Sequence, residues 1–339
     1  MLTYDCEAFV AAAIDSMLAQ DYHGPLEIVI SDDASSDRTF DVTRDLLAGY
    51  RGPRRVIVRR RRANSGSKSA HLNDAFSACT GELLVSFDGD DVSVPTRVSL
   101  IVARFVANPR VQSIYSAFAL MGAAGRRERR SRVTRPLPAA DPAEWFARVD
   151  AYAAGATLAV RRAVVETFGP LDGSLNEDVQ LPFRAALIGD VEFIDEPLVR
   201  VRRHAGSFTA DWERYRSVRN YTERMIAGIE TASRARIARR ADIDTAERML
   251  PASHVRWDRL RSVVERSFHE AEMTRALVSE AMLDRLRGLL ALARVGAYKA
   301  EFAQHAFLAI APQLYLNYRR LRLGLAAKKS GPAAREGGA

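Results

Sequence analysis

Residues 83–91 read Leu83-Leu84-Val85-Ser86-Phe87-Asp88-Gly89-Asp90-Asp91, an apolar run that ends on three carboxylates within four positions. A strand that is buried on both faces is continuously apolar, so these acids follow the carboxyl end of a buried strand. Open α/β sheets bind their ligands at that edge. Carboxylates this close repel one another unless a cation offsets their charge, and hard oxygen ligands suit Mg²⁺ or Mn²⁺ bridging to phosphate. The stretch therefore predicts a sheet edge that binds a metal-bound nucleotide diphosphate.

Short apolar runs alternate with helical patterns on both sides of this strand, up to about Thr209. We predict strands at residues 26–31, 55–60, 83–87, 111–120 and 199–203, and helices at residues 7–20, 38–50, 68–77, 96–107 and 179–187. This alternation predicts an α/β fold with a mainly parallel sheet and helices on both faces. Beyond residue 209 the chain is rich in Arg, Ala, Leu and Glu. We expect an all-helical region over residues 210–327 and a disordered tail over residues 328–339.

The composition is that of a globular protein, with 339 residues, 47% hydrophobic, 27% charged and a formal net charge of +8. Arginine clusters at residues 59–62, 126–130 and 200–203 suit phosphates or anionic lipid head groups. No nucleic-acid-binding signature accompanies them, so we expect no nucleic-acid partner. Two unpaired cysteines and the lack of any apolar run near about 18 residues favour a cytoplasmic location.

Two further polar stretches follow predicted strands. Asp32 and Asp33 close the strand at residues 26–31, and capping of the next helix explains only part of this acidic cluster. Asp33 is then available to a nucleobase imide or a ribose. The stretch from Asn64 to Lys68 precedes a helix, where it suits either an ordinary turn or an anion site. It lacks the P-loop pattern, which disfavours that class of ATPase.

The last polar stretches lie near residues 177 and 203. Glu177 and Asp178 occupy a first helical turn, where the helix dipole alone favours acids, so a structural role and a chemical one both stay open. Arg202 and Arg203 end an alternating strand, where they can neutralise a leaving diphosphate. His204 can join them or help to hold the metal.

In combination these blocks resemble the family 2 glycosyltransferases of the GT-A fold, over roughly residues 1–209, which would then form the catalytic domain. The matching blocks are Thr3-Tyr4 with the helix ending at Gln20, residues 30–39 around Asp32-Asp33, the DxD block at residues 88–91, and Glu177-Asp178 with Leu181 and Arg184. Members normally have an apolar strand before the Thr-Tyr pair, whereas this chain starts at Met1-Leu2. We therefore expect a truncated first strand and a true start further upstream.

The resemblance implies a role for each matching residue. By the resemblance, nucleotide-sugar binding falls to Thr3, Tyr4, Asp32, Asp33, Asp88 and Arg184, and metal binding to Asp90 and Asp91. The patterns described above add Asn64, Lys68, Arg202 and Arg203 to the nucleotide-sugar site and His204 to the metal site. Asp178 would be the general base that takes the acceptor proton, with Glu177 positioning it. The expected cofactor is Mg²⁺ or Mn²⁺.

We therefore expect an inverting, metal-dependent glycosyltransferase of cell-surface polysaccharide synthesis. Its donor would be UDP-, GDP- or dTDP-linked, and its acceptor a glycan or a lipid-linked sugar. A nucleotidyltransferase of sugar phosphates is one alternative, although the glycine-rich phosphate loop of that class is not visible. A basic membrane- or nucleic-acid-binding protein without catalysis is another. Residues 297–325 fit either a packed helix or an amphipathic helix that contacts the anionic inner face of the membrane.

Overall fold

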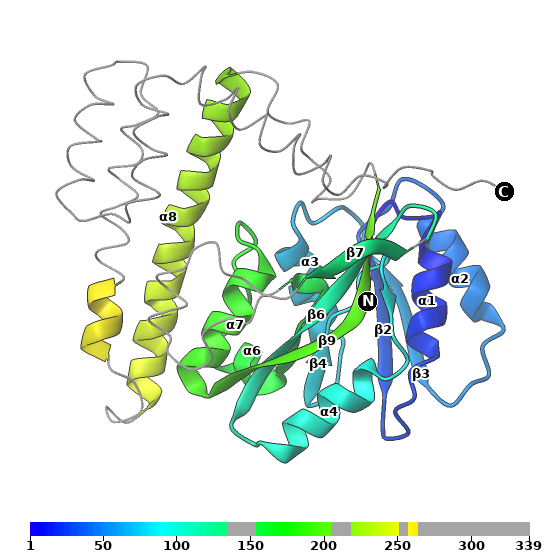
Figure 1. Cartoon of the computed structure of the whole chain (residues 1–339), viewed down its shortest axis with the longest axis horizontal. Coiled ribbons are helices and arrows are strands. Elements are labelled where there is room, and N and C mark those ends of the chain that lie inside the picture. Colours follow the sequence, from blue (N-terminus) through cyan, green and yellow to red (C-terminus); the bar gives the residue numbers. More distant parts are fainter. Residues whose placement is uncertain (126, 134–153, 205–217, 251–256, 264–339) are drawn as a thin grey trace, which may run out of the picture. The chain divides into compact units, whose positions relative to one another are not determined.

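The computed structural model describes residues 1–125, 127–133, 154–204, 218–250 and 257–263 (Figure 1). Its elements are, in chain order, β1 (Leu2–Thr3), α1 (Val10–Leu18), β2 (Glu27–Asp32), α2 (Thr39–Ala48), β3 (Arg55–Arg60), α3 (Lys68–Ser77), β4 (Leu83–Val85), β5 (Val92–Ser93), α4 (Arg97–Ala107), β6 (Val111–Gly122), β7 (Arg127–Val133), the 3₁₀ helix η1 (Gly155–Thr157), β8 (Ala159–Arg161), α6 (Arg162–Phe168), α7 (Glu177–Ile188), β9 (Asp190–Arg203) and α8 (Val218–Met249). The predicted α/β class is confirmed. β3 and α3 have the predicted bounds, and α3 begins there because the Ser67 hydroxyl caps the Ala70 amide at 3.1 Å.

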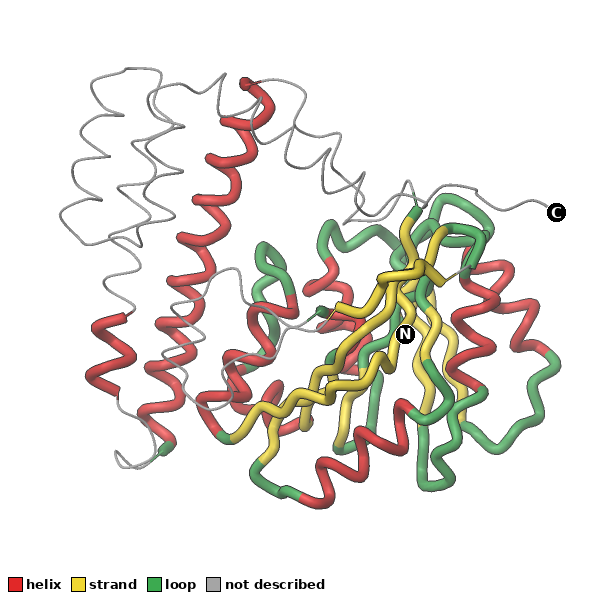
Figure 2. The backbone as a smooth tube through the Cα atoms, in the orientation of Figure 1, coloured by secondary structure: helices red, strands yellow, loops and turns green. Residues whose placement is uncertain are grey.

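The first half of the sheet is parallel, as expected. β1 pairs with β2, and β2 pairs with β3, both in parallel register. A parallel bridge between Leu2 and Asp88 then joins β1 to the segment that follows β4. Figure 2 shows the strands as a central layer with helices on both sides. The residues after β4 are therefore held against the middle of the sheet by backbone hydrogen bonds.

The second half of the sheet adds short antiparallel pairs to the parallel ones. β6 and β9 form a long parallel pair, but β4 with β8, β6 with β8, β5 with β9 and β6 with β7 are all antiparallel. The sequence pattern missed β5 and β8 because strands of two or three residues are too short to show an alternation.

Apolar faces of the helices hold the layers together. α1 buries Val10, Ile14 and Met17 in a cluster with β2, and α7 buries Leu181 and Phe183 in a second cluster with α3. Each fully buried side chain of this size contributes roughly 1.5–3 kcal/mol to folding. These two clusters hold the carboxyl end of β2 and the first turn of α7, where the predicted site residues lie.

Residues 234–264 pack with residues 1–205 in one compact unit. One link is an ion pair between Arg184 of α7 and Asp242 of α8, with Nε and the carboxylate 3.1 Å apart, and both side chains are buried. The domain boundary at residue 209 stays a prediction, as does the tail at residues 328–339. The amphipathic segment at residues 297–325 and most of the arginine-rich cluster at residues 126–130 lie outside the residues whose side chains are described. Within the described part of the chain, no helix has the length and apolar character needed to cross a membrane.

Candidate active site

The predicted acids lie at three chain segments: the carboxyl end of β2, the turn after β4, and the first turn of α7. A close contact holds the second of these in place. A Cβ atom on Gly89 would come within 2.8 Å of Thr3 Cγ2 and 3.0 Å of the Leu2 carbonyl oxygen. The glycine between Asp88 and Asp90 therefore lets the turn lie directly against β1.

Asp32 is held entirely by protein groups. Its carboxylate accepts hydrogen bonds from the Ser35 amide at 3.0 Å, from the Ser35 hydroxyl at 2.5 Å and from the Thr3 hydroxyl at 3.3 Å. Arg60 Nε lies 3.4 Å from the same carboxylate. Asp32 and Thr3 are both buried. These contacts hold the end of β1 against the loop after β2.

Asp33 is engaged in the same way by the loop after β3. It accepts hydrogen bonds from the Ser65 amide at 2.9 Å and the Ser65 hydroxyl at 2.6 Å, and it pairs with Arg61 Nε at 3.1 Å. The Asn64 side chain donates to the Asp33 carbonyl oxygen at 3.2 Å. The structure thus brings together Asp33 and Asn64, two of the residues predicted to bind the nucleotide-sugar.

Tyr4 lies beside these acids with its side chain exposed to solvent. The neighbouring Asp5 carboxylate raises the pKa of the Tyr4 phenol. Asp5 has a positive φ of 43°, and its carboxylate accepts a hydrogen bond of 2.7 Å from the Ser36 amide. This contact joins the loop after β1 to the loop after β2 and leaves the Tyr4 ring at the surface.

Lys68 connects the turn after β4 with α7. Its Nζ atom lies 2.8 Å from Asp88 Oδ2 and 2.9 Å from Glu177 Oε1. Burial lowers the pKa of Lys68, but the two carboxylates outweigh that effect and hold the pKa well above its usual value. A Cβ atom on Gly155 would lie 2.0 Å from Glu177 Oε1, so only a glycine leaves room for this pair.

Asp178 and Asp88 each have one buried oxygen, Oδ1, without a hydrogen-bond partner among the described residues. Burial, followed by the charge of Glu177, raises the pKa of Asp178 to about 7, and the charge of Asp88 acts in the same direction. A carboxylate with this pKa can take up a proton near neutral pH. The arrangement is suited to general-base chemistry at the first turn of α7.

The predicted metal ligands are brought together in part. His204 Nε2 lies 3.1 Å from Asp90 Oδ2. Asp91 is turned toward the backbone and accepts a 2.9 Å hydrogen bond from the Arg202 amide. Burial, followed by the charges of Asp90 and Asp88, raises the pKa of Asp91 to about 8. Within the described ranges, no three acidic, histidine or cysteine side chains lie close enough together to hold a metal ion by themselves.

The arginines at the end of β9 differ in placement. Arg202 is buried, donates from Nε to the Asp90 carbonyl oxygen at 2.8 Å, and stacks over Phe9 at 4.9 Å from the ring centroid. Phe9 also contacts the His204 ring at 4.6 Å. Arg203 is exposed and lies opposite Gly122 of β6.

Arg184 is the predicted site residue that the structure places elsewhere. Its guanidinium is buried, and it binds Asp242 at 3.1 Å and the Gly169 carbonyl oxygen at 2.9 Å. These contacts hold α7 to the second half of α8. The donor-binding role expected for Arg184 stays a prediction, and none of these contacts supports it.

Three residues of the site were missed from the sequence. Phe9 and Gly155 carry no pattern of their own, because their partners are distant in the chain. Arg97, at the start of α4, is fully buried and donates to the carbonyl oxygens of Ser86 at 2.7 Å and Ala156 at 2.8 Å. Burial lowers the pKa of Arg97 to about 10. Arg97 therefore links the end of β4 to η1 through hydrogen bonds to the backbone of both.

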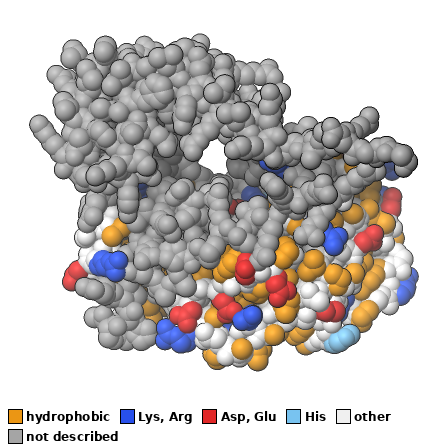
Figure 3. Space-filling view, viewed as in Figure 1, with side chains coloured by type: hydrophobic (Ala, Val, Ile, Leu, Met, Phe, Trp, Pro, Cys, Tyr) orange, Lys and Arg blue, Asp and Glu red, His pale blue; other side chains and the backbone are white. Residues whose placement is uncertain are grey.

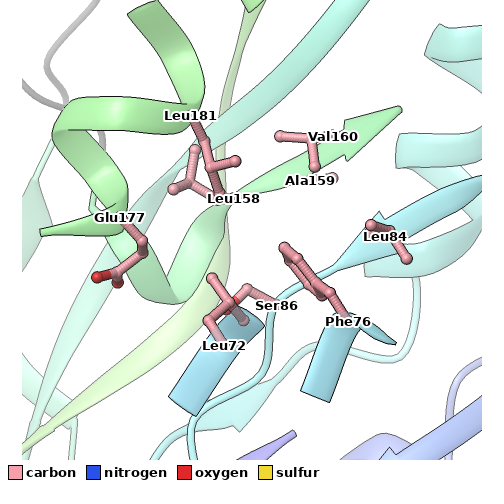
Figure 4. A pocket seen from close by; sticks show the side chains of 9 residues that line it. All are labelled: Leu72, Phe76, Leu84, Ser86, Leu158, Ala159, Val160, Glu177 and Leu181. Carbon is pink, nitrogen blue, oxygen red and sulfur yellow. The ribbon is translucent and has the colours of Figure 1, made fainter. Parts of the chain in front are cut away.

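An apolar pocket adjoins the site on the side of Glu177. Its lining consists of Leu72, Phe76, Leu84, Ser86, Leu158, Ala159, Val160, Glu177 and Leu181. Figure 4 shows the Glu177 carboxylate directed away from the leucine side chains of this lining. Because the lining is almost wholly apolar, we attribute this pocket to the packing of α7 on β4 and β8. The candidate site lies at the acids outside the pocket.

Comparisons with known proteins relate this chain to a family. A sequence model of the family described as glycosyl transferase family 2 matches residues 1–169. The putative glycosyltransferase EpsE of Bacillus subtilis is 34% identical over 100 residues, which cover 30% of this chain and 34% of that protein. The Escherichia coli enzyme WfaP, named UDP-Glc:alpha-D-GlcNAc-diphosphoundecaprenol beta-1,3-glucosyltransferase, is 29% identical over 115 residues, which cover 34% of this chain and 43% of that protein. The chain thus spans less than half the length of these two relatives.

A solved structure has a similar fold. Residues 1–349 of Staphylococcus aureus TarS, in complex with UDP-GlcNAc, superpose with a TM-score of 0.54 and 16% identity, over 88% of this chain and 91% of that chain. This similarity concerns the fold, and it supports the α/β architecture described above. The match over residues 1–169, which contain the acids after β2 and β4, shows that the chain belongs to glycosyl transferase family 2.

Proposed function

We propose that this protein is an inverting, metal-dependent glycosyltransferase that moves a sugar from a nucleotide-diphospho-sugar to a glycan or lipid-linked acceptor. The observation that carries the proposal is the pairing of Lys68 with both Asp88 and Glu177, at 2.8 Å and 2.9 Å. It brings the acid that follows β4 next to the helix turn that carries Asp178. A donor at the strand end and an acceptor hydroxyl at α7 would meet there.

The donor side would be formed by the ends of β1, β2 and β3. The residues assigned to the nucleoside are Thr3, Tyr4, Asp32, Asp33 and Asn64. The exposed ring of Tyr4 offers a surface on which a base can stack. Asp88, with its unpartnered oxygen, would face the ribose and the sugar phosphate. Arg202 and Arg203 at the end of β9 would offset the charge of the diphosphate.

The residues around Asp90 suit a divalent cation. The buried Asp88 Oδ1 has no hydrogen-bond partner in the described part of the chain, and Asp90 and His204 offer an oxygen and an imidazole nitrogen at one point. Mg²⁺ and Mn²⁺ are commonly bound by one or two protein ligands and completed by substrate phosphates. Asp90 and His204, with Asp91 beside them, would thus hold the ion. When bound, the ion supplies positive charge to the leaving diphosphate.

The chemistry of the chain itself centres on Asp178. Its carboxylate would accept the proton of the acceptor hydroxyl, while that oxygen forms a bond to the anomeric carbon. The bond from this carbon to the diphosphate breaks, and the electron pair leaves with the diphosphate. Because attack comes from the opposite side, the configuration inverts. Glu177 and Lys68 would hold Asp178 at the acceptor, and a pKa of about 7 suits a base that works near neutral pH.

Polysaccharide synthesis at the cytoplasmic face of the membrane is the setting we propose. The printed name of WfaP describes a UDP-linked donor and a lipid-linked acceptor. Membrane contact itself would depend on residues 297–325. Figure 3 shows acidic and basic side chains interspersed over the coloured part of the face in view, rather than gathered by sign. This part of the surface gives no added support for binding to anionic lipid.

A titration with nucleotide-sugars tests the proposal. UDP-glucose, UDP-GlcNAc, GDP-mannose and dTDP-glucose are titrated calorimetrically with and without Mn²⁺, and release of the nucleotide diphosphate is followed for those that bind. We expect Mn²⁺-dependent binding of one donor, lost in Asp90→Ala. Asp45→Ala is the matched control, because Asp45 lies exposed on α2 and pairs with Arg44. A donor affinity that is the same with and without Mn²⁺, and the same in Asp90→Ala, would contradict metal-dependent transfer.

A further inference from the structure

The position of Lys68 carries an inference beyond donor binding. Its ammonium group is half-buried between two carboxylates from different parts of the chain, Asp88 after β4 and Glu177 at the start of α7. Because two carboxylates already pair with the ammonium group of Lys68, we do not expect it to bind the diphosphate as a third anion. Lys68 thus differs from Arg202 and Arg203 at the end of β9, which we assign to the diphosphate.

The surroundings of Lys68 are built to hold α7. From α3, the Ser69 hydroxyl donates to the Leu175 carbonyl oxygen at 2.5 Å, and Asn73 Nδ2 donates to the Leu171 carbonyl oxygen at 2.8 Å. These bonds attach α3 to the loop that leads into α7. Lys68, the first residue of α3, extends this attachment to Glu177, the first residue of α7.

The backbone of η1 lies against the contact between Lys68 and Glu177. A Cβ atom on Gly155 would lie 2.0 Å from Glu177 Oε1 and 3.3 Å from Lys68 Nζ. The Glu177 carboxylate thus lies between the backbone of Gly155 and the ammonium group of Lys68. Asp178 follows directly in the same helical turn, and its buried oxygen has no partner of its own among the described residues.

We propose that Lys68 is a positioning residue that acts through Glu177 to hold Asp178 in place for proton transfer, and that it joins the donor side of the site to the acceptor side. This inference rests on the proposed function. The charged groups that face Asp178 are Glu177 on its own helix, Lys68 on α3 and Asp88 after β4. Glu177 and Asp88 act to retain the proton on Asp178, and Lys68 acts to release it.

A double-mutant cycle tests whether Lys68 acts through Glu177. Lys68→Met and Glu177→Gln, alone and combined, are compared by nucleotide release from the active donor, with water as the acceptor. Misplacing a base by about 1 Å lowers kcat roughly 100-fold, so we expect each single variant to lose about 10- to 100-fold in kcat with little change in donor KM. The double variant should lose no more than about threefold beyond the worse single variant, because both remove one connection.

Gly155→Ala disturbs the same contact without changing any charge. It should lower kcat in the same way, whereas Gly49→Ala, where an added Cβ meets nothing within 4 Å, is the matched control. Multiplied losses in the double variant, or a raised donor KM with unchanged kcat in Lys68→Met, would overturn the proposal and return Lys68 to direct donor binding.

Titration of Asp178 provides a readout that needs no activity. In protein labelled with ¹³C at aspartate side chains, the Asp178 resonance is assigned by its loss in Asp178→Asn. Lys68→Met should move its titration to higher pH, and Glu177→Gln should move it to lower pH. Equal titration in both variants would refute the link between Lys68 and Asp178. If the wild-type protein binds no donor while the two variants show these opposite shifts, the proposed function alone is contradicted.

Discussion

Asp32 and Asp33, at the end of β2, have every carboxylate oxygen bonded to protein groups, whereas Asp88 and Asp178 each keep one buried oxygen without a partner among the described residues. Fully bonded buried carboxylates stabilise the loops around them. A buried oxygen without a partner costs free energy in the unliganded protein. The comparison indicates that the proposed nucleoside side is prearranged, while the proposed reaction side would be completed by a ligand.

The greatest expected effect concerns the reaction side. Asp178→Asn removes the base but keeps the shape of the side chain, so transfer should fall about 1,000-fold, within the range known for general bases. Donor affinity should stay the same, because Asp178 lies on the acceptor side. Calorimetric donor binding and nucleotide release measure the two quantities separately. Near-normal turnover in Asp178→Asn would show that another group takes the proton.

A smaller effect is expected for stability on the nucleoside side. Asp32→Ala leaves the buried Ser35 amide and hydroxyl without an acceptor, and it should cost about 2 kcal/mol of the free energy of unfolding. Asp88→Ala should cost about 1 kcal/mol or less, because Lys68 keeps its pair with Glu177 and the Asp88 pair is partly exposed to solvent. Urea unfolding gives both values. Equal losses of unfolding free energy in Asp32→Ala and Asp88→Ala would contradict the proposed difference between the two regions.

The smallest expected effect is a dependence of stability on pH. The folded-state pKa of Asp178, about 7, lies above its value of 3.8 in an unfolded chain, so the folded state binds this proton more tightly. The stability that the bound proton contributes is lost as the pH rises from about 4 to about 7. The unliganded protein should therefore melt a few degrees higher at pH 5.5 than at pH 8.

Asp178→Asn is the control for that measurement. The substitution removes the titrating group, so the difference in melting temperature between the two pH values should shrink. Asp91, whose pKa is raised to about 8, acts in the same direction and should account for the part that remains. An unchanged difference in Asp178→Asn would show that Asp178 titrates normally.

Much of the fold was predictable because its signals are local. β3 and α3 have the predicted bounds, since β3 is a run of β-branched residues between arginines and α3 follows a capping serine. The end of β2 was predictable to within one residue because acids stop an apolar run there, whereas β4 ends at Val85, two residues before the predicted end. β5 and β8 were missed, because strands of two or three residues are defined by their partners.

The candidate site divides in the same way. The types and order of its acids are visible in the sequence, because charge at a strand end and a first helical turn are local features. Their partners are not, because Lys68 meets Glu177 across 109 positions in the chain, and only packing of α3 against α7 makes that contact. Arg184 shows the converse, since the family resemblance implied donor binding for it, while its buried pair with Asp242 of α8 is a contact that no local pattern predicted.

The sequence by itself determined the α/β class, the strand ends that carry the acids, and the resemblance to a glycosyltransferase family, because apolar periodicity and charge are properties of neighbouring residues. Tertiary structure alone decided which carboxylates are satisfied and which keep an unpartnered oxygen. Those differences arise where distant segments are packed together, since burial and the distance between charges set the pKa of each acid.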